Sequence, residues 1–356
     1  MFSRQPKAKS FADDYNYDAP PPPSRFRRSR KLLWIIVGVL VVIVLGVGLG
    51  VGLGLGLGGS DDNSGQSGSG NSTSPTPAFP SPTGNVTNRV FWQPAVNSTW
   101  QIVLLNPIEV DASATKTVPD VQVFDIDLFT NNQSTIATLH SLGKKVICYF
   151  SAGSYEPGRP DSSEFQPADL GKELDGWPGE KWLQLNSQNV RKIMSARIKL
   201  ASEQGCDAID PDNVDGYSNN NGLSLTEKDS IDYMQFLSSQ AGQYNMSCGL
   251  KNAGAIIPQV LNFTHFSVNE QCVQYEECST FAPFIQDNKP VFHIEYPDGS
   301  GKALSASTVS GICDDSGNAA NSTDFSTVMK NMNLDGWVEY CNGMIATTVT
   351  NVTSSS

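Results

Sequence analysis

Residues 90–345 alternate between short apolar runs and longer amphipathic stretches. The apolar runs predict strands near residues 101–105, 121–127, 145–151, 207–212, 248–252, 265–270, 291–296 and 326–332. The amphipathic stretches predict helices near residues 133–142, 190–204, 226–243 and 255–261. Alternating strands and helices are typical of parallel strands joined by right-handed crossovers, and about 255 residues is a usual size for one (β/α)8 TIM barrel. We therefore expect an α/β fold of this kind.

Most of the apolar runs end in polar side chains that could act on a ligand. In chain order these are Asp125, Asp127, Tyr149, Ser151, Asp210, Asp212, Asn252, Asn269, Glu270, His293 and Glu295. Residues two apart on a strand share a face, and the carboxyl ends of the strands of a closed barrel surround the mouth that holds the active site. Any one of these residues could be a helix cap or a strand-end hydrogen-bonding group, but six strands ending in this way favour a functional site.

The most acidic of these strand ends lies in segment 205–217, GCDAIDPDNVDGY. Its acids Asp210, Asp212 and Asp215 would crowd one strand end, and repulsion between neighbouring carboxylates should raise the pKa of at least one of them. Carboxylates with separated pKa values suit acid/base or nucleophilic chemistry on a sugar. The alternatives are ordinary turn acids or a calcium loop. Val214 breaks the calcium-loop pattern, and Asn221 stands where that pattern closes with Glu.

The chain before residue 90 divides into three expected segments. Residues 1–31 form a basic head with eight Lys/Arg and three Asp/Glu, and residues 32–59 form an uncharged apolar run longer than the roughly 20 residues that span a bilayer. The positive-inside rule makes this run a type II signal anchor in the cell membrane, with the folded domain outside the cell. A cleaved signal peptide is the alternative. Residues 60–89 are expected to be a disordered stalk, and residues 346–356 a disordered tail.

Cysteine, glycosylation and charge patterns agree with export. All seven cysteines follow residue 90, and Cys272–Cys278 and Cys313–Cys341 are candidate disulfides, with at least one cysteine left unpaired. The Asn-x-Ser/Thr triplets lie beyond the head, beginning at Asn71, Asn85, Asn97, Asn132, Asn245, Asn262, Asn321 and Asn351. No CxxC pair supports a zinc site, so no metal or cofactor is expected. Residues 32–356 hold 16 basic and 33 acidic residues, which disfavours nucleic acid and favours a cationic ligand.

The strand-end motifs, taken in order, resemble glycoside hydrolase family 114, the endo-α-1,4-polygalactosaminidases. The motifs are FDID at 124–127, VICYFSAG at 146–153, GCDAIDPDNVDGY at 205–217, LKN at 250–252, FSVNE at 266–270 and HIEY at 293–296. The resemblance covers residues 90–345 and implies a (β/α)8 barrel that hydrolyses α-1,4-linked galactosamine inside a polymer such as galactosaminogalactan. Deacetylated galactosamine is cationic near neutral pH, which fits an acidic exported domain.

The resemblance also implies the catalytic pair, Asp212 and Glu270. A glycosidase needs one carboxylic acid to protonate the leaving oxygen and one carboxylate to attack or to activate water. We expect Asp212, in its polar loop, to be the nucleophile or a charged stabiliser, and Glu270 to be the acid/base because Phe266 and Val268 on its face could raise its pKa. The reverse assignment is the alternative. Retention of configuration is expected, although it depends on a carboxylate separation that the sequence does not contain.

Further strand-end residues are expected to contact the substrate's amino groups, hydroxyls and ring faces. They are Asp125, Asp127, Tyr149, Asp210, Asn213, Asn252, His293, Glu295 and Tyr296. Two other functions would also explain these acidic strand-end residues. One is a glycosidase for a different hexosamine, and the other is a non-catalytic module that binds cell-wall polysaccharide. The second would not need the pair Asp212 and Glu270. The oligomeric state stays open.

Overall fold

The computed structural model describes residues 90–351. The expected basic head, membrane anchor and stalk, and the last five residues of the expected tail, lie outside the described residues. Among the residues that are described, no helix is both long enough and apolar enough to cross a membrane.

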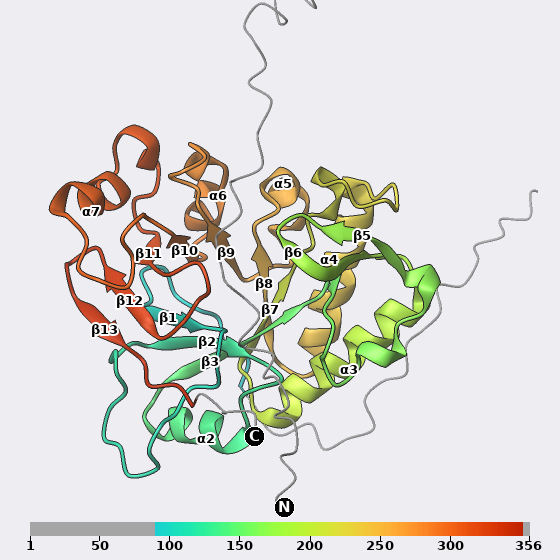
Figure 1. Cartoon of the computed structure of the whole chain (residues 1–356), viewed down its shortest axis with the longest axis horizontal. Coiled ribbons are helices and arrows are strands. Elements are labelled where there is room, and N and C mark those ends of the chain that lie inside the picture. The colour runs from blue at the N-terminus through green and yellow to red at the C-terminus, as the bar shows by residue number, and fades with distance from the viewer. Residues whose placement is uncertain (1–89, 352–356) are drawn as a thin grey trace, which may run out of the picture. The chain divides into compact units, whose positions relative to one another are not determined.

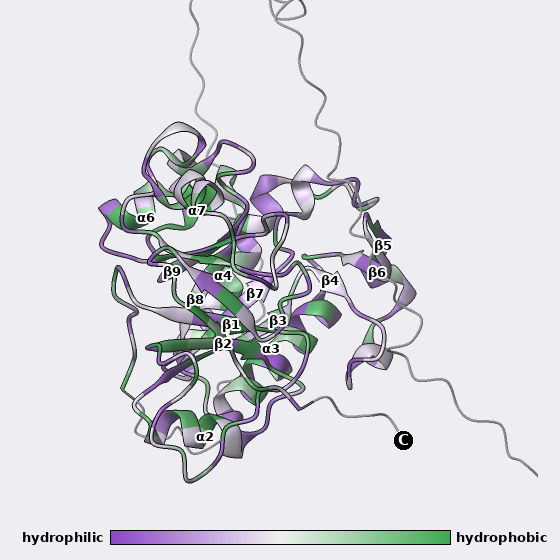
Figure 2. Cartoon of the chain, turned by 60° about the vertical axis from the view of Figure 1, so that its left-hand side comes forward, coloured by the Kyte–Doolittle hydropathy of each residue, from purple (hydrophilic) through white to green (hydrophobic). Residues whose placement is uncertain are grey.

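The core of the domain is a curled sheet that begins with eight parallel strands (Figure 1). In sheet order they are β1 (Trp100–Val103), β2 (Val123–Asp127), β3 (Lys145–Ser151), β7 (Ala208–Asp212), β8 (Ser247–Lys251), β9 (Phe266–Glu270), β10 (Val291–Glu295) and β11 (Ser326–Met329). Every neighbouring pair is parallel. These strands are almost wholly buried, as parallel sheets are, and Figure 2 shows apolar residues concentrated in them. The predicted strands are therefore confirmed, with ends that shift by a few residues.

The sheet curls far enough for β1 and the residue after it to contact β11 and the residues that follow β11. Trp100 Nε1 donates to the Ser326 backbone oxygen at 2.7 Å, and Tyr340 Oη donates to the Trp100 backbone oxygen at 2.9 Å. The Leu104 amide donates to the Leu334 oxygen at 3.0 Å. The two ends of the sheet are thus joined by individual hydrogen bonds.

Helices lie outside the curled sheet. They are α2 (Gln133–Ser141), α3 (Gln188–Gln204), α4 (Glu227–Gln243), α5 (Ile257–Val260), α6 (Ala282–Gln286) and α7 (Ala306–Cys313). The two longest begin at strong caps: Ser187 accepts from the amides of Asn189 and Val190, and Thr226 forms a capping box with Asp229. Both bury one apolar face, which is what fixes an amphipathic helix on a sheet.

The expectation of eight regular β/α units is only partly met. Within the described residues, no helix lies between β1 and β2. After β11, the strands β12 (Trp337–Tyr340) and β13 (Ile345–Thr347) extend the sheet antiparallel instead of forming an eighth helix. A second sheet, hereafter the inserted sheet, lies between β3 and α3 and consists of β4 (Ser154–Tyr155), β5 (Leu170–Leu174) and β6 (Trp177–Leu183). It was not predicted because β4 is very short and β5 and β6 have weak apolar alternation.

Three disulfides cross-link the domain. Cys272–Cys278 and Cys313–Cys341 are the two predicted pairs, and Cys148–Cys206 joins β3 to the segment just before β7. Cys248 is the unpaired cysteine and lies buried in β8. Burial raises the pKa of the Cys248 thiol, which keeps it protonated and unreactive.

Candidate active site

The predicted strand-end residues gather along one edge of the parallel strands, because parallel strands all finish at the same edge. The register places Asp127, Tyr149 and Asp210 side by side on β2, β3 and β7. Ser151 and Asp212 are paired two residues further along. The site is built on this row of strand ends.

Asp212 ends β7, and three donors hold its carboxylate. Its Oδ2 accepts from Tyr149 Oη at 2.9 Å and from Lys251 Nζ at 3.1 Å, and its Oδ1 accepts from the Asn213 amide at 2.7 Å. Its backbone oxygen accepts from the Gly153 amide at 2.9 Å. A Cβ on Gly153 would lie 1.7 Å from the Asn213 oxygen, so only glycine allows this close approach of the two segments.

Glu270 ends β9, and three donors hold its carboxylate as well. Its Oε1 accepts from Tyr296 Oη, while its Oε2 accepts from Asn252 Nδ2 at 3.0 Å and lies 3.2 Å from Lys251 Nζ. Asn252 Oδ1 also accepts from the Glu270 amide at 2.9 Å. Burial alone would raise the pKa of Glu270, but the Lys251 charge and the hydrogen bonds from Tyr296 and Asn252 lower it.

The expectation that Phe266 and Val268 would raise the pKa of Glu270 is therefore wrong. Both apolar side chains are fully buried, whereas the Glu270 side chain is 24% exposed and its carboxylate meets charged and polar donors from β8 and β10. These donors stabilise the ionised form. Asp212 is 16% exposed, so a ligand can reach both carboxylates.

Lys251 is a residue of this site that the sequence-based prediction did not include. It ends β8, its side chain is 2% exposed, and its Nζ contacts Asp212 and Glu270 at the same time. Burial alone would lower the pKa of Lys251, but the surrounding carboxylates raise it, so the side chain stays charged. A lysine that completes an otherwise uncharged buried strand is the signal that could have revealed it, because a buried charge needs a partner.

Three more carboxyl groups surround the pair. Asp125 and Asp210 are fully buried and interact with each other; burial raises both pKa values, that of Asp210 to about 7. Asp215, in the loop after β7, has a pKa raised to about 6 by burial and by Asp212. The predicted crowding of acids with raised pKa values is confirmed. Asp125 and Asp210 lie beneath the surface, so they affect the site through its electrostatics.

Tyr149, Asn252 and Tyr296 were expected to contact the substrate, and here they donate to the two catalytic candidates. Burial, together with the facing carboxylates of Asp212 and Glu270, raises the pKa of both tyrosines. The phenols therefore stay protonated and keep donating over the whole physiological pH range.

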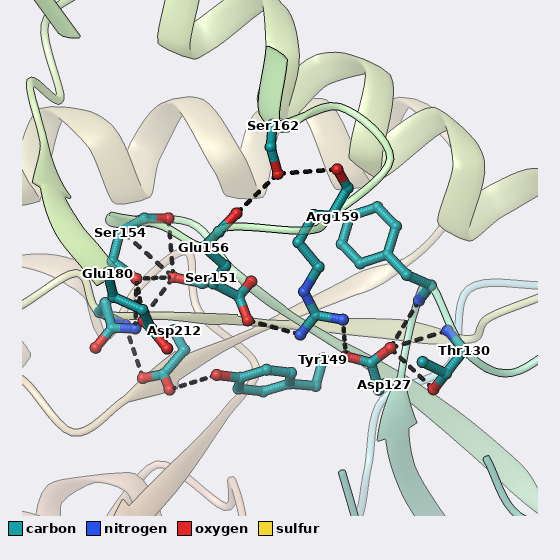
Figure 3. Close-up of polar contacts among 12 residues, drawn as sticks. Asp127, Thr130, Tyr149, Ser151, Ser154, Glu156, Arg159, Ser162, Glu180 and Asp212 are labelled. Carbon is teal, nitrogen blue, oxygen red and sulfur yellow. Dashed lines mark hydrogen bonds and ion pairs between the residues drawn. The ribbon is translucent and has the colours of Figure 1, made fainter. Parts of the chain in front are cut away.

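Asp127 is engaged within the protein. Its Oδ1 accepts from the amides of Phe129 and Thr130 at 3.0 and 2.9 Å, and its Oδ2 lies 2.7 Å from Arg159 Nη1. Arg159 Nη2 contacts Glu156 Oε1 at 2.6 Å as well (Figure 3). With 1% of its side chain exposed, Asp127 fixes the loop after β2 and the Arg159 side chain.

The inserted sheet adds a carboxylate that was not predicted. Glu180, on β6, accepts from Ser154 Oγ at 3.1 Å (Figure 3). The same Ser154 Oγ accepts from Asn213 Nδ2 at 3.2 Å, which links the inserted sheet to the residue after Asp212. Burial and the nearby Glu156 raise the pKa of Glu180 to about 7. Its place near Asp212 depends on the pairing of β6 with β4, so no local pattern indicated it.

His293 and Glu295 lie under the loop that follows β9. Glu295 Oε1 accepts from the Val273 amide at 2.8 Å and lies 2.8 Å from His293 Nε2, while His293 Nδ1 is 3.0 Å from Thr327 Oγ1. Both side chains are buried. They were expected to contact substrate, but in this structure they hold the loop that begins at Glu270.

One group of side chains in the described residues has the spacing of metal ligands, namely Cys272, Cys278 and His293. The two sulfurs form a disulfide with each other. They are therefore not thiolates and do not make a zinc site.

Two partly exposed carboxylates at the carboxyl ends of parallel strands, held by fixed donors, are the arrangement of a glycoside hydrolase. The chain matches the sequence profile of glycoside-hydrolase family GH114 over residues 82–346 and belongs to this family.

Solved structures agree with this assignment. The crystal structure of Aspergillus fumigatus Ega3 in complex with galactosamine is 55% identical, covers 72% of this chain and 100% of its own, and has a TM-score of 0.65. Two structures of the glycoside hydrolase domain of PelA from Pseudomonas aeruginosa are 9% identical, with TM-scores of 0.53 and 0.50, and cover 71% of this chain and 99% of theirs. At that identity the likeness is one of fold. No curated protein sequence matches this chain.

Proposed function

We propose that this protein is a retaining, endo-acting hydrolase of α-1,4-linked galactosamine polymers, with Asp212 as nucleophile and Glu270 as acid/base. The position of Lys251 carries the proposal. Its Nζ lies 3.1 Å from Asp212 Oδ2 and 3.2 Å from Glu270 Oε2. These two oxygens are therefore at most about 6.3 Å apart. Retaining enzymes separate their carboxyl groups by about 5–5.5 Å and inverting enzymes by about 6.5–9.5 Å, and an upper limit below the inverting range supports retention.

The proposed reaction has two steps. In the first, Asp212 Oδ attacks the anomeric carbon, the glycosidic C–O bond breaks, and its electron pair takes the proton of Glu270, so that a glycosyl ester of Asp212 forms. In the second, the ionised Glu270 removes a proton from water, the water oxygen attacks the anomeric carbon, and Asp212 leaves as carboxylate. The proton returns to Glu270, and each step balances.

The proposed substrate rests on charge and on the relative. Asp210, Asp212, Asp215 and Glu270 make the site strongly acidic, and Lys251 is the one cation that contacts the pair within the described residues. Such a site concentrates a polymer that carries ammonium groups. The structure of Ega3 is a complex with galactosamine, and its 55% identity to this chain supports the same sugar here.

We place this reaction outside the cell, on a TIM-type barrel held by the membrane anchor predicted at residues 32–59. The three disulfides of the domain support export, because disulfides persist in oxidising compartments. Protease treatment of intact cells tests the orientation. Digestion of the domain supports it, and protection of the domain contradicts it.

Mass spectrometry of the products tests the activity. The full-length chain is incubated with partially deacetylated α-1,4-galactosaminan, and proton NMR follows the anomeric configuration of newly released ends. We expect galactosamine oligomers whose first-formed reducing ends are α. Glu270→Gln should lower kcat by about 10²–10⁴-fold, the usual contribution of a general acid. Asp212→Asn should lower it by at least as much, because no glycosyl ester can form.

Three other outcomes would change the proposal. First-formed β ends would replace retention by inversion. Cleavage of other hexosamine polymers, with galactosaminan untouched, would keep the enzyme class and change its specificity. Binding of polysaccharide without any cleavage would make the protein a polysaccharide-binding module.

A further inference from the structure

A single ammonium group serves both catalytic carboxylates. Lys251 Nζ lies 3.1 Å from Asp212 and 3.2 Å from Glu270, and it makes the only ion pair with either among the described residues. The lysine is 2% exposed, so solvent does not screen its charge. Its Nζ also lies 5.7 Å from the centre of the Tyr149 ring, within the range of a cation–π contact.

The charges around this lysine do not otherwise balance. Asp210 and Asp215 approach from β7 and its loop, and the paired Asp125 approaches from β2. The remaining neighbours of the two carboxylates are neutral donors: Tyr149 on β3, Asn252 after β8 and Tyr296 after β10. Lys251 is thus the positive charge that stabilises the ionised forms of Asp212 and Glu270.

We propose that Lys251 is a shared counter-ion that balances Asp212 before the glycosidic bond breaks and Glu270 afterwards, and that it thereby sets the upper pH limit of the reaction. This inference rests on the proposed function.

The charge count of the reaction explains why one lysine suffices. Before the first step Asp212 is ionised and Glu270 holds the proton, so the two carboxyl groups carry one negative charge. In the glycosyl enzyme Asp212 is a neutral ester and Glu270 is ionised, so the charge is again one. Because Lys251 contacts both side chains, it neutralises that charge at either position without moving. The negative charge therefore moves from Asp212 to Glu270 during the first step, and the fixed ammonium group of Lys251 neutralises it in both places.

The same contact limits activity at higher pH. Lys251, Tyr296 and Asn252 lower the pKa of Glu270 in the free enzyme. The protonated form needed for the first step is then lost as pH rises through that lowered value. When both Asp212 and Glu270 are ionised, the pair carries two negative charges against the single positive charge of Lys251, and Glu270 has no proton to donate. Removing the lysine charge should let Glu270 keep its proton to higher pH.

The test compares pH profiles of kcat/KM for the full-length wild type, Lys251→Met and Lys251→Arg, with partially deacetylated α-1,4-galactosaminan. In Lys251→Met we expect the alkaline limb to move up by about 1–3 pH units, the size of the effect of one adjacent opposite charge. Lys251→Arg keeps the charge and should keep the limb in place, even where its bulk lowers the rate. The substrate's amines titrate identically in all three assays.

A second measurement does not depend on turnover. Carbon-13 labelling of glutamate side chains reports Glu270 directly, and its resonance is identified by its loss in Glu270→Gln. This resonance should titrate at higher pH in Lys251→Met than in the wild type. If Lys251→Met does not fold, the double variant Lys251→Met/Asp210→Asn removes one buried carboxyl group together with the lysine, and the Glu270 resonance should still titrate at higher pH than in the wild type, although by less than in Lys251→Met.

The outcomes are distinguishable. Lower rates in Lys251→Met and Lys251→Arg with an unmoved alkaline limb and unmoved Glu270 titration would make Lys251 a packing residue and overturn the inference. Absence of cleavage by the wild type would overturn the proposed function, and with it any pH limit of the reaction. The NMR titration would even then decide whether Lys251 controls the charge of Glu270.

Discussion

Two groups of carboxylates near Tyr149 differ in how their charge is compensated. At the strand ends, Asp212 and Glu270 share Lys251, and the pKa of Glu270 is lowered. In the segment that follows β4, Arg159 contacts Glu156, whereas Glu180 on β6 accepts only a neutral hydrogen bond from Ser154. Burial then raises the pKa of Glu180 to about 7.

The comparison teaches that adjacent cations and hydrogen-bond donors, set against burial, determine the direction in which the pKa of a glutamate moves in this protein. Glu180 and Glu270 are the same residue type, and both are largely buried, yet their pKa values move in opposite directions. A catalytic carboxylate can therefore be tuned without changing the carboxylate itself.

The largest expected effect comes from removing Arg159, which pairs with Asp127 as well as with Glu156. Arg159→Met leaves Asp127, which is 1% exposed, without an ionic partner, and breaking such a buried pair costs about 3–5 kcal/mol. Urea unfolding measures the loss. Arg159→Lys keeps a charge and should lose less. A loss below about 1 kcal/mol for Arg159→Met would place the pair among weak surface ion pairs.

The next effect concerns the hydrogen bonds to Glu270. Tyr296→Phe removes a donor to the ionised carboxylate, a bond worth about 1.5–3 kcal/mol, so the alkaline limb of kcat/KM should move up by about 1–2 pH units. Tyr149→Phe is the matched control, because that phenol donates to Asp212. Equal displacement of the limb in both variants would contradict the assignment of Glu270 as the acid.

The anchor of the loop after Glu270 should have a moderate effect. Glu295→Ala leaves the buried Val273 amide without its acceptor, which costs about 1–3 kcal/mol in unfolding free energy. It should lower kcat more than it raises KM, because Glu295 acts through the position of Glu270. Glu295→Gln keeps an acceptor oxygen and should recover most of kcat. If KM rises while kcat is unchanged, Glu295 contacts the substrate, as the sequence suggested.

The smallest effect is a slope in stability. The pKa of Glu180 is raised from 4.5 to about 7, so the folded state binds its proton more tightly than the unfolded state does. Its favourable contribution is complete below pH 4.5 and is lost as pH rises through 7. Between pH 5 and 8, Glu180→Gln should lose about 1–2 kcal/mol less unfolding free energy than the wild type. Melting curves would show this as a shallower decline of Tm with pH. Parallel curves would show that Glu180 is more solvated than its burial indicates.

The strands could be predicted from sequence because each parallel strand is a short apolar run that ends in polar residues, as β7 and β9 do. Asp212 and Glu270 were among the strand-end candidates for the same reason, since a carboxylate at the end of a buried strand is a local feature, and the resemblance to family 114 singled them out as the proposed pair. The inserted sheet was not found because β4 is only two residues long and β5 and β6 carry little apolar alternation of their own.

Sequence by itself thus determined the parallel strands, two of the three disulfides and the carboxylates at the strand ends. Only the tertiary structure decided the charge and the role of each side chain. Lys251 reaches Asp212 from 39 residues away, Arg159 pairs with Asp127, and Glu295 accepts from the Val273 amide. Ionisation depends on burial and on charges a few ångströms away, and those distances exist only once distant strands have come together.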